Sequence, residues 1–264
     1  MRYGFIGCGN MGGAIARAVC AAVSSDDVIL ANKTRSKAEK LAMELGCRVG
    51  SNFDAARCDF LFLGVKPHMM ADMLQEIRDV LRKNPSVILV TMAAGLTMER
   101  IRDMAGGSYA MIRIMPNTPA AIGEGMIQYC TLNVPDEAEA EFLRIMAPAG
   151  RLDRLPENLI DAASAVSGCG PAYAALFIEA LADGGVACGL PRQKAVEYAA
   201  QMLCGSAKLL LEKELHPGQM KDAVCSPGGS TIQGVRTLEE CGFRGAVIDA
   251  VIAAFEKNRE LGKN

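Results

Sequence analysis

A run of residues close to Met1 has the types and spacing that bind phosphate groups. Gly7, Gly9 and Gly12 fit the pattern G-x-G-x-x-G, directly after a predicted strand and at the start of a predicted helix. In such a turn the first glycine permits a tight bend, the second lets a pyrophosphate approach the backbone, and the third lets helix and strand pack closely. The helix start adds free N–H groups and a positive dipole end. The order of strand, motif, helix and second strand favours a dinucleotide site over a merely glycine-rich turn.

The residues that follow the second predicted strand indicate which dinucleotide is bound. A site for NAD usually has Asp or Glu about 20 residues past the motif, where it binds the ribose 2′-hydroxyl. This chain has Asn32-Lys-Thr-Arg-Ser-Lys37 at that place. Cations and hydroxyls can bind a 2′-phosphate, and no carboxylate is present to repel it. We therefore expect NADPH, with NADH as an alternative cofactor. The competing interpretation is a solvated basic loop with Ser36 as a helix cap.

Loops at the carboxyl ends of the other predicted strands should complete the dinucleotide site. Lys66 is either a charge partner of the cofactor or a surface lysine. Asn117 is expected to contact the nicotinamide or the substrate, the alternative being a turn residue between two prolines. The residues expected to contact the cofactor are Gly7, Gly9, Asn10, Met11, Gly12, Asn32, Lys33, Thr34, Arg35, Asn52, Val65, Lys66, Pro67, Ala93, Ala94, Gly95 and Asn117.

A second candidate anion site lies far from the first in the sequence, at Ser226-Pro-Gly-Gly-Ser-Thr231. Glycines without Cβ atoms, hydroxyl groups and the free N–H groups of a helix start together make an anion pocket. The simpler alternative is an ordinary turn between two helices, capped by Ser230. No metal site is expected, because His68 and His216 are far apart and no cysteines are spaced C-x-x-C. His216 is better interpreted as an N-cap residue.

The pattern of apolar residues indicates the elements that position these sites. Strands are predicted at 3–7, 28–32, 59–65, 86–91 and 109–114, and helices at 11–23, 36–45, 70–81 and 97–104. Such alternation is typical of a doubly wound parallel sheet, so the fold class is α/β. After about residue 153 the segments become rich in Ala and Leu, and helices are predicted at 158–166, 171–188, 191–214, 217–224, 231–241 and 244–261.

We therefore predict a Rossmann-type NADP-binding domain over residues 1–153 and an all-helical domain over 154–264 that binds substrate and dimerises. The helix at 171–188 is apolar around most of its circumference. A helix of this kind must be buried on all sides, and packing against a second subunit would achieve that.

Composition limits the other functions that the chain could have. The 28 Lys and Arg residues against 30 Asp and Glu give a net charge of −2, which attracts neither nucleic acid nor an anionic membrane. The longest stretch without a charged side chain, 162–178, is interrupted by Gly168, Gly170 and Pro171 and is shorter than the ~20 apolar residues of a membrane span. The ten cysteines are expected to be reduced. We expect a cytoplasmic protein without a membrane segment.

The chain resembles the pyrroline-5-carboxylate reductase family over almost its whole length. The resemblance implies reduction of 1-pyrroline-5-carboxylate to L-proline with NAD(P)H, the last step of proline biosynthesis. It also implies a Rossmann domain followed by a helical domain that interlocks with a second subunit, in dimers that commonly form decamers. Cys169 and Ser230 depart from the usual residues but fit the space. The motifs that carry the resemblance are Val166-Ser-Gly-Cys-Gly-Pro-Ala-Tyr173, Gly189-Leu-Pro191, His216-Pro-Gly218, Ser226 to Thr231, Leu238-Glu239, Gly7 to Gly12, Val65-Lys-Pro67 and Met115-Pro-Asn-Thr-Pro119.

By that resemblance, Ser226, Gly229, Ser230 and Thr231 bind the carboxylate and ring nitrogen of the substrate, and Thr231 is the catalytic residue that orients the nitrogen. Two other functions remain open. A β-hydroxyacid or imine dehydrogenase could share the two-domain plan, but no motif distinguishes a catalytic lysine among Lys194, Lys208, Lys213 and Lys221. A non-catalytic NADPH-sensing module would not need the second anion turn.

Overall fold

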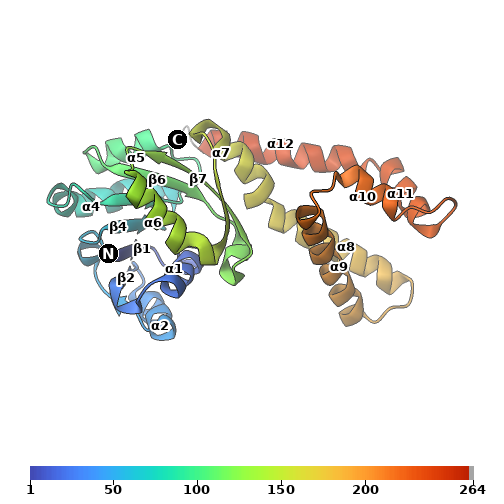
Figure 1. Ribbon diagram of the computed structural model, residues 1–264, viewed down its shortest axis with the longest axis horizontal. Coiled ribbons are helices and arrows are strands. Elements are labelled where there is room, and N and C mark those ends of the chain that lie inside the picture. The colour runs from blue at the N-terminus through green and yellow to red at the C-terminus, as the bar shows by residue number, and fades with distance from the viewer. Residues whose placement is uncertain (262–264) are drawn as a thin grey trace. The chain divides into compact units, whose positions relative to one another are not determined.

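A single eight-stranded sheet is the centre of the first part of the computed structural model, which describes residues 1–261 (Figure 1). The strand order is β3-β2-β1-β4-β5-β6-β7-β8, and neighbouring strands are parallel except β6 and β7. This order reverses direction between β1 and β4, which makes their carboxyl ends the switch point where such sheets bind ligands. The strands are β1 Tyr3–Ile6, β2 Val28–Ala31, β3 Arg48–Val49, β4 Phe60–Leu63, β5 Ile88–Thr91, β6 Ala110–Met115, β7 Gly125–Leu132 and β8 Gly150–Arg154.

Helices cover both faces of this sheet, as the doubly wound prediction requires. Phe5 and Phe62 stack with ring centroids 4.4 Å apart on the face that is covered by α1, α2 and α6. Ile6 and Leu63 point to the opposite face, where α3, α4, α5 and α7 pack. Alternate residues of one strand thus enter two different cores, so the central strands are buried over their full length. The helices of this part are α1 Asn10–Ala22, α2 Arg35–Leu45, α3 Asn52–Ala55, α4 Met70–Arg82, α5 Met98–Ala105, α6 Asp136–Met146 and α7 Glu157–Ala163.

Several elements of the first part are not predicted by the sequence pattern. These are β3, α3 and the segment from β7 through α6 to β8. The last of these segments extends the sheet by an antiparallel strand and a parallel edge strand. The sheet is therefore mixed, whereas the alternation of strands and helices predicted a parallel one.

The boundary between the two compact units lies later in the chain than the domain boundary at 153/154 that the sequence predicted. One compact unit comprises Met1–Cys169 together with the stretch from Ala254, and the second comprises Gly170–Ala253. The physical reason is α7, which packs against the sheet of the first unit through the fully buried Ile160. A π-helical turn, η5 (Ser164–Gly168), then leads to the second unit.

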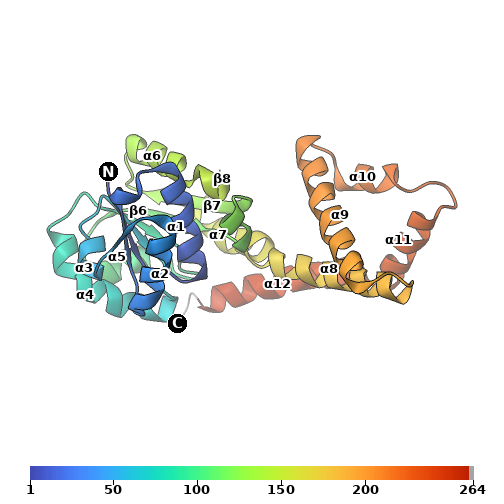
Figure 2. The same ribbon diagram turned by 90° about the horizontal axis from the view of Figure 1, so that it is seen from below.

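The second unit consists of helices that bury few of their own side chains. In α8 only Ala182 is buried, and large apolar side chains such as Leu176 and Leu211 are mostly exposed. This agrees with the expectation that the helix at 171–188 does not find its packing partners within the chain. Helices α8 and α9 pack against each other (Figure 2). The helices are α8 Gly170–Ala187, α9 Arg192–Glu212, α10 Pro217–Ala223, α11 Ser230–Glu240 and α12 Phe243–Leu261, the last of which begins in this unit and ends in the first.

One helical run has the length and composition that a membrane span needs. Over Glu157–Ala187 the helices are continuous, and 11% of the most apolar window is buried. The sequence prediction excluded a span in this region because of its glycines and proline.

Candidate active site

The glycine-rich turn between β1 and α1 has the backbone that a pyrophosphate site requires. Gly7 has a φ of +100°, which favours glycine, and a Cβ atom on Gly12 would lie 2.0 Å from the carbonyl oxygen of Gly7. A Cβ atom on Gly9 would meet nothing within 4 Å, so the backbone there is open to a ligand. Gly9 is also the N-cap of α1, and this helix start receives no capping hydrogen bond from a side chain of residues 1–261. The tight bend at Gly7 and the close packing at Gly12 are those that the motif predicted, and the binding of a pyrophosphate at Gly9 stays a prediction.

Asn32 connects this turn to the end of β2. Its Oδ1 accepts a hydrogen bond of 2.9 Å from the N–H of Cys8, and its Nδ2 donates one of 2.9 Å to the carbonyl oxygen of Thr34. The side chain therefore holds the glycine-rich turn next to the β2–α2 loop. Burial raises the pKa of Cys8 to about 12, so the thiol is neutral and adds no negative charge beside the turn.

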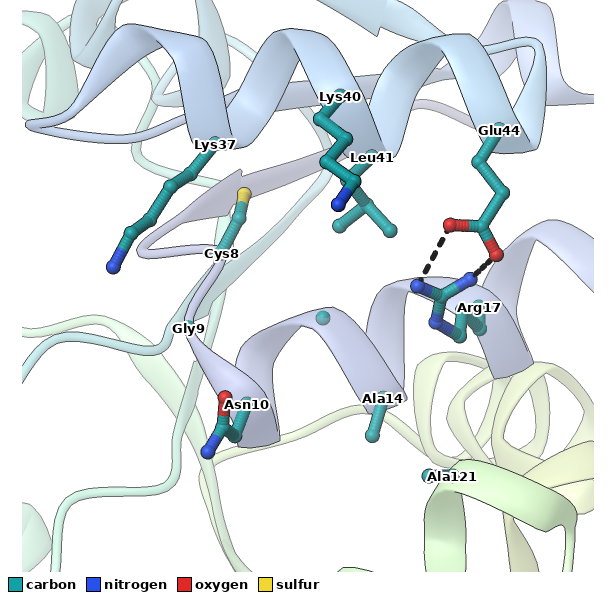
Figure 3. A pocket seen from close by; sticks show the side chains of 11 residues that line it. Cys8, Gly9, Asn10, Ala14, Arg17, Lys37, Lys40, Leu41, Glu44 and Ala121 are labelled. Atoms are coloured by element: carbon teal, nitrogen blue, oxygen red, sulfur yellow. Dashed lines mark hydrogen bonds and ion pairs between the residues drawn. The ribbon is translucent and has the colours of Figure 1, made fainter.

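A cavity of about 430 Å³ lies between α1 and α2 beside Gly9 and Asn10. In Figure 3 the side chains of Lys37 and Lys40 extend from α2 into the space between the two helices, and the Arg17–Glu44 ion pair lies farther along it. Neither lysine forms an ion pair within residues 1–261. An uncapped helix start and two unpaired cations make this cavity suitable for the phosphates of a dinucleotide.

The cations that line this cavity are only partly those that the sequence predicted near the 2′-phosphate. Arg35 and Lys33 are exposed, but the Nε of Arg35 donates a 2.9 Å hydrogen bond to Glu39, which competes with any phosphate. Lys37 belongs to the basic run noted in the sequence, whereas Lys40 was missed. The i, i+3 spacing of the two lysines, which places them on one face of α2, was the signal that could have identified both.

The remaining expected cofactor residues lie where the strand ends place them. Val65, Lys66 and Pro67 follow β4, and Lys66 is exposed without an ion pair in the described part of the chain. Ala93, Ala94 and Gly95 follow β5, and Asn52 follows β3. The Nδ2 of Asn52 donates a 2.9 Å hydrogen bond to Glu76 of α4. All these loops belong to the carboxyl edge of parallel strands, the edge that carries the glycine-rich turn.

The side chain of Asn117 has a structural role that the sequence did not predict. It is 8% exposed, its Nδ2 donates a 3.0 Å hydrogen bond to the carbonyl oxygen of Ser167, and its Oδ1 accepts one of 3.0 Å from the N–H of Met126. Both ends of the amide are thus occupied by backbone groups. Asn117 therefore holds the end of β6 to β7 and to the turn η5, and its contact with the nicotinamide or the substrate stays a prediction.

The second anion turn opens α11 in the helical unit. Gly228 has a φ of +71°, and Gly229 is the N-cap of α11 without a capping side chain. Ser230 is therefore the first residue of the helix, and the alternative in which Ser230 caps it is wrong. Ser226, Ser230 and Thr231 are exposed. Hydroxyl groups and free N–H groups at one helix start can bind a carboxylate.

His216 has the structural role that the sequence predicted. Its Nδ1 accepts a 3.1 Å hydrogen bond from the N–H of Gly218, and Gln219 completes a capping box at the start of α10. Within residues 1–261, no group of three His, Cys, Asp or Glu side chains is arranged to hold a metal ion.

A doubly wound sheet with a glycine-rich turn, cations in place of the usual carboxylate and an attached helical unit defines a two-domain NADP-dependent oxidoreductase. Comparison with family models agrees with this class. The model described as "NADP oxidoreductase coenzyme F420-dependent" matches residues 2–95, and the model described as "Pyrroline-5-carboxylate reductase dimerisation" matches residues 157–261. The exposed apolar side chains of α8 to α12 therefore belong to a unit whose family self-associates.

Whole-chain relatives identify the family. The pyrroline-5-carboxylate reductase of Escherichia coli (strain K12) is 40% identical over 269 residues, which span 100% of this chain and 99% of that protein. The crystal structure of Plasmodium falciparum pyrroline carboxylate reductase with NADP bound is 32% identical, with a TM-score of 0.88 over 99% of this chain and 98% of that one. The Coxiella burnetii pyrroline-5-carboxylate reductase gives a TM-score of 0.90 at 29% identity, over 100% and 99% of the two chains. The chain belongs to the pyrroline-5-carboxylate reductase family.

Proposed function

We propose that this protein reduces 1-pyrroline-5-carboxylate to L-proline with NADPH, the last step of proline biosynthesis. The observation that carries the proposal is the pair of uncapped helix starts, one at the glycine-rich turn before α1 and one at the Gly228–Gly229 turn before α11. The first suits the phosphates of the cofactor, and the second suits the carboxylate of a small substrate. Both lie in a chain whose relatives carry the name of this reductase.

The residues present fit the cofactor. The open backbone at Gly9 and the N–H groups of Asn10, Met11 and Gly12 would hold the pyrophosphate, and the cations of the β2–α2 region would hold the 2′-phosphate. The loops after β4 and β5 would border the rest of the molecule. When bound, NADPH supplies a hydride for the carbon of the imine bond.

The turn before α11 provides the groups that would hold the substrate. The backbone N–H of Ser230 and the hydroxyl of Ser226 would donate hydrogen bonds to the carboxylate, whereas the N–H of Gly229 already donates a 3.0 Å hydrogen bond to the carbonyl oxygen of Ser226 and shapes the turn. The hydroxyl of Thr231 accepts a hydrogen bond from the protonated ring nitrogen and fixes the orientation of the imine. The turn contains no titratable side chain from Ser226 to Thr231, so its contribution to rate is positioning rather than acid–base chemistry.

The proposal also includes an assembly larger than the dimer that the matched dimerisation family indicates. We infer a homodimer built through α8 to α12, further assembly to a decamer, and a cytoplasmic location. The nearly equal numbers of acidic and basic residues support the absence of nucleic-acid and membrane partners. The apolar run over 157–187 is then an element of the subunit interface rather than a membrane span.

The experiment compares substrates of different chemistry with the purified protein. Oxidation of NADPH is followed with 1-pyrroline-5-carboxylate, with a panel of cyclic and acyclic imines, and with 3-oxoacids that a hydroxyacid dehydrogenase would reduce. We expect rapid oxidation with 1-pyrroline-5-carboxylate and formation of L-proline. Turnover of a 3-oxoacid alone would instead support the hydroxyacid dehydrogenase interpretation, and NADPH binding without turnover would support a sensing module.

A further inference from the structure

Arg113 of β6 is a buried charge that the proposed function does not use. It is 1% exposed, and its guanidinium is bound by two carboxylates of α7. Nη1 donates a 3.2 Å hydrogen bond to Glu157 Oε1, and Nη2 donates one of 2.7 Å to Asp161 Oδ1. The Nε is buried without a hydrogen-bond partner in residues 1–261. A buried charge is tolerated only when it is paired with an opposite charge or hydrogen-bonded, so the positions of Glu157 and Asp161 relative to Arg113 are tightly restricted.

The two carboxyl-bearing residues extend this cluster to other elements. Glu157 Oε1 also accepts a 2.7 Å hydrogen bond from the N–H of Met98, the first residue of α5. The carbonyl oxygen of Asp161 accepts a 3.2 Å hydrogen bond from Nδ2 of Asn258 in α12. Arg113, Glu157 and Asp161, which we name the junction cluster, therefore join β6, α5, α7 and the last part of α12. All these contacts lie within the first compact unit.

The junction cluster lies at both places where the chain connects the two units. The chain leaves the first unit after Cys169, directly after α7 and η5, and returns at Ala254, four residues before Asn258. Further hydrogen bonds attach η5, the segment through which the chain leaves the first unit. Ser167 Oγ donates a 3.0 Å hydrogen bond to Gln128 Oε1 of β7, and Nδ2 of Asn117 donates one to the carbonyl oxygen of Ser167. Polar contacts of fixed direction thus attach both connections to β6 and β7.

We propose that Arg113 is a positioning residue of the reductase, acting through Glu157 and Asp161 to fix the two connections of the helical unit to the nucleotide-binding sheet. This inference rests on the proposed function. The cofactor turn belongs to the first unit and the substrate turn to the second, so under the proposed function catalysis needs both units and the two chain connections that join them. An apolar contact would bury the surface equally well but would specify direction less strictly.

The test uses two variants of Arg113. Arg113→Met keeps most of the length of the side chain and removes the charge. Arg113→Lys keeps the charge and removes the planar guanidinium that binds both carboxylates. Arg102→Met is the matched control, since Arg102 pairs with Glu99 and Asp103 on the exposed side of α5. Each variant is assayed for kcat, for the KM toward the imine substrate, for the Kd of NADPH and for the isotope effect with NADPH deuterated at the transferred position. A misplacement of about 1 Å lowers reaction rates up to about a hundredfold.

For Arg113→Met we expect kcat to fall at least about tenfold with a larger isotope effect, while the Kd of NADPH changes by less than about twofold. Arg113→Lys should recover part of the lost kcat, and the control should match the parent protein. A folded Arg113→Met protein with the parent kcat and isotope effect would overturn the proposal. A parallel loss of NADPH affinity would also overturn it, because the sheet itself would then be disturbed.

If Arg113→Met does not fold, Asp161→Asn decides the question, since it weakens one charged contact and keeps the shape of the side chain. The same drop in kcat without a change in NADPH affinity supports the proposal, and an unchanged kcat refutes it. Amide hydrogen exchange separates this outcome from a failure of the proposed function. If the parent protein does not reduce 1-pyrroline-5-carboxylate, faster exchange confined to α7 and the end of α12 in Asp161→Asn still supports the junction cluster, and unchanged exchange refutes it.

Discussion

Replacing Lys37 and Lys40 together by Met tests how the cavity between α1 and α2 recognises NADPH. Both side chains line the cavity beside Gly9 and Asn10, and neither is paired within residues 1–261. Methionine keeps most of the apolar stem and removes only the charge. Because NADH lacks the 2′-phosphate, the loss should fall on NADPH alone.

The size of the effect follows from the contacts available to each cation. A hydrogen bond to a charged group contributes about 1.5 to 3 kcal/mol, and solvent screening places these exposed lysines at the low end. Two such contacts correspond to about 3 kcal/mol, or about a hundredfold in KM for NADPH. Arg35→Ala should cost less, about threefold to tenfold, because its guanidinium is already bound to Glu39 at 2.9 Å.

The assay measures KM for NADPH and for NADH at low and at high ionic strength. The double variant should raise KM for NADPH strongly and KM for NADH by less than about twofold, and added salt should weaken NADPH binding to the parent protein more than to the variant. Equal losses for both cofactors would show that the lysines bind the pyrophosphate common to both or support the fold, and do not bind the 2′-phosphate. An unchanged KM for NADPH would remove the cavity from the cofactor site.

The other predictions concern the substrate turn, assembly and buried thiols. Thr231→Ala should lower kcat/KM by about tenfold to a hundredfold with NADPH affinity unchanged, whereas Thr231→Ser should keep most activity; the opposite order would make Thr231 a packing residue. At nanomolar concentration, sedimentation should detect no folded monomer of 28.0 kDa, because α8 to α12 expose large apolar side chains; a stable active monomer would contradict this. Burial raises the pKa of Cys58 and of Cys130 to about 11, so the unfolded chain loses these protons first and the free energy of unfolding should decrease between pH 9 and 11. Cys58→Ala should reduce that slope in urea titrations and the exposed Cys204→Ala should not; equal slopes would refute the assignment.

Elements with a strong apolar pattern were predictable from the sequence. Strands that form only because their backbone pairs with a neighbouring strand were not. The central strands β1, β2, β4 and β5 are buried on both faces, so their continuous apolar runs are visible in the sequence. Edge strand β8 is mostly exposed and contains Arg151, Asp153 and Arg154, and it becomes a strand only because β7 offers a partner for its backbone. A local pattern carries no sign of such pairing.

The same limit applied to side chains of the site. The glycine roles follow from local backbone geometry, which is why Gly7, Gly9 and Gly12 could be assigned from their spacing. The partners of Asn117, in contrast, are 9 and 50 residues away in the sequence, and only the fold brings Met126 and Ser167 to its amide. The pairing of Arg113 with α7 was hidden for this reason, since a lone arginine within an apolar strand has no local explanation.

Single-turnover product analysis shows most directly whether both anion sites serve one reaction. The parent protein is mixed with 1-pyrroline-5-carboxylate and NADPH deuterated at the transferred position, and the product is examined by mass spectrometry. We predict L-proline that carries one deuterium, formed in step with NADPH oxidation, and formation of this product about tenfold to a hundredfold more slowly in Thr231→Ala while NADPH still binds. Oxidation of NADPH without labelled proline, or an undiminished rate of product formation in Thr231→Ala, would contradict a shared role for the two sites.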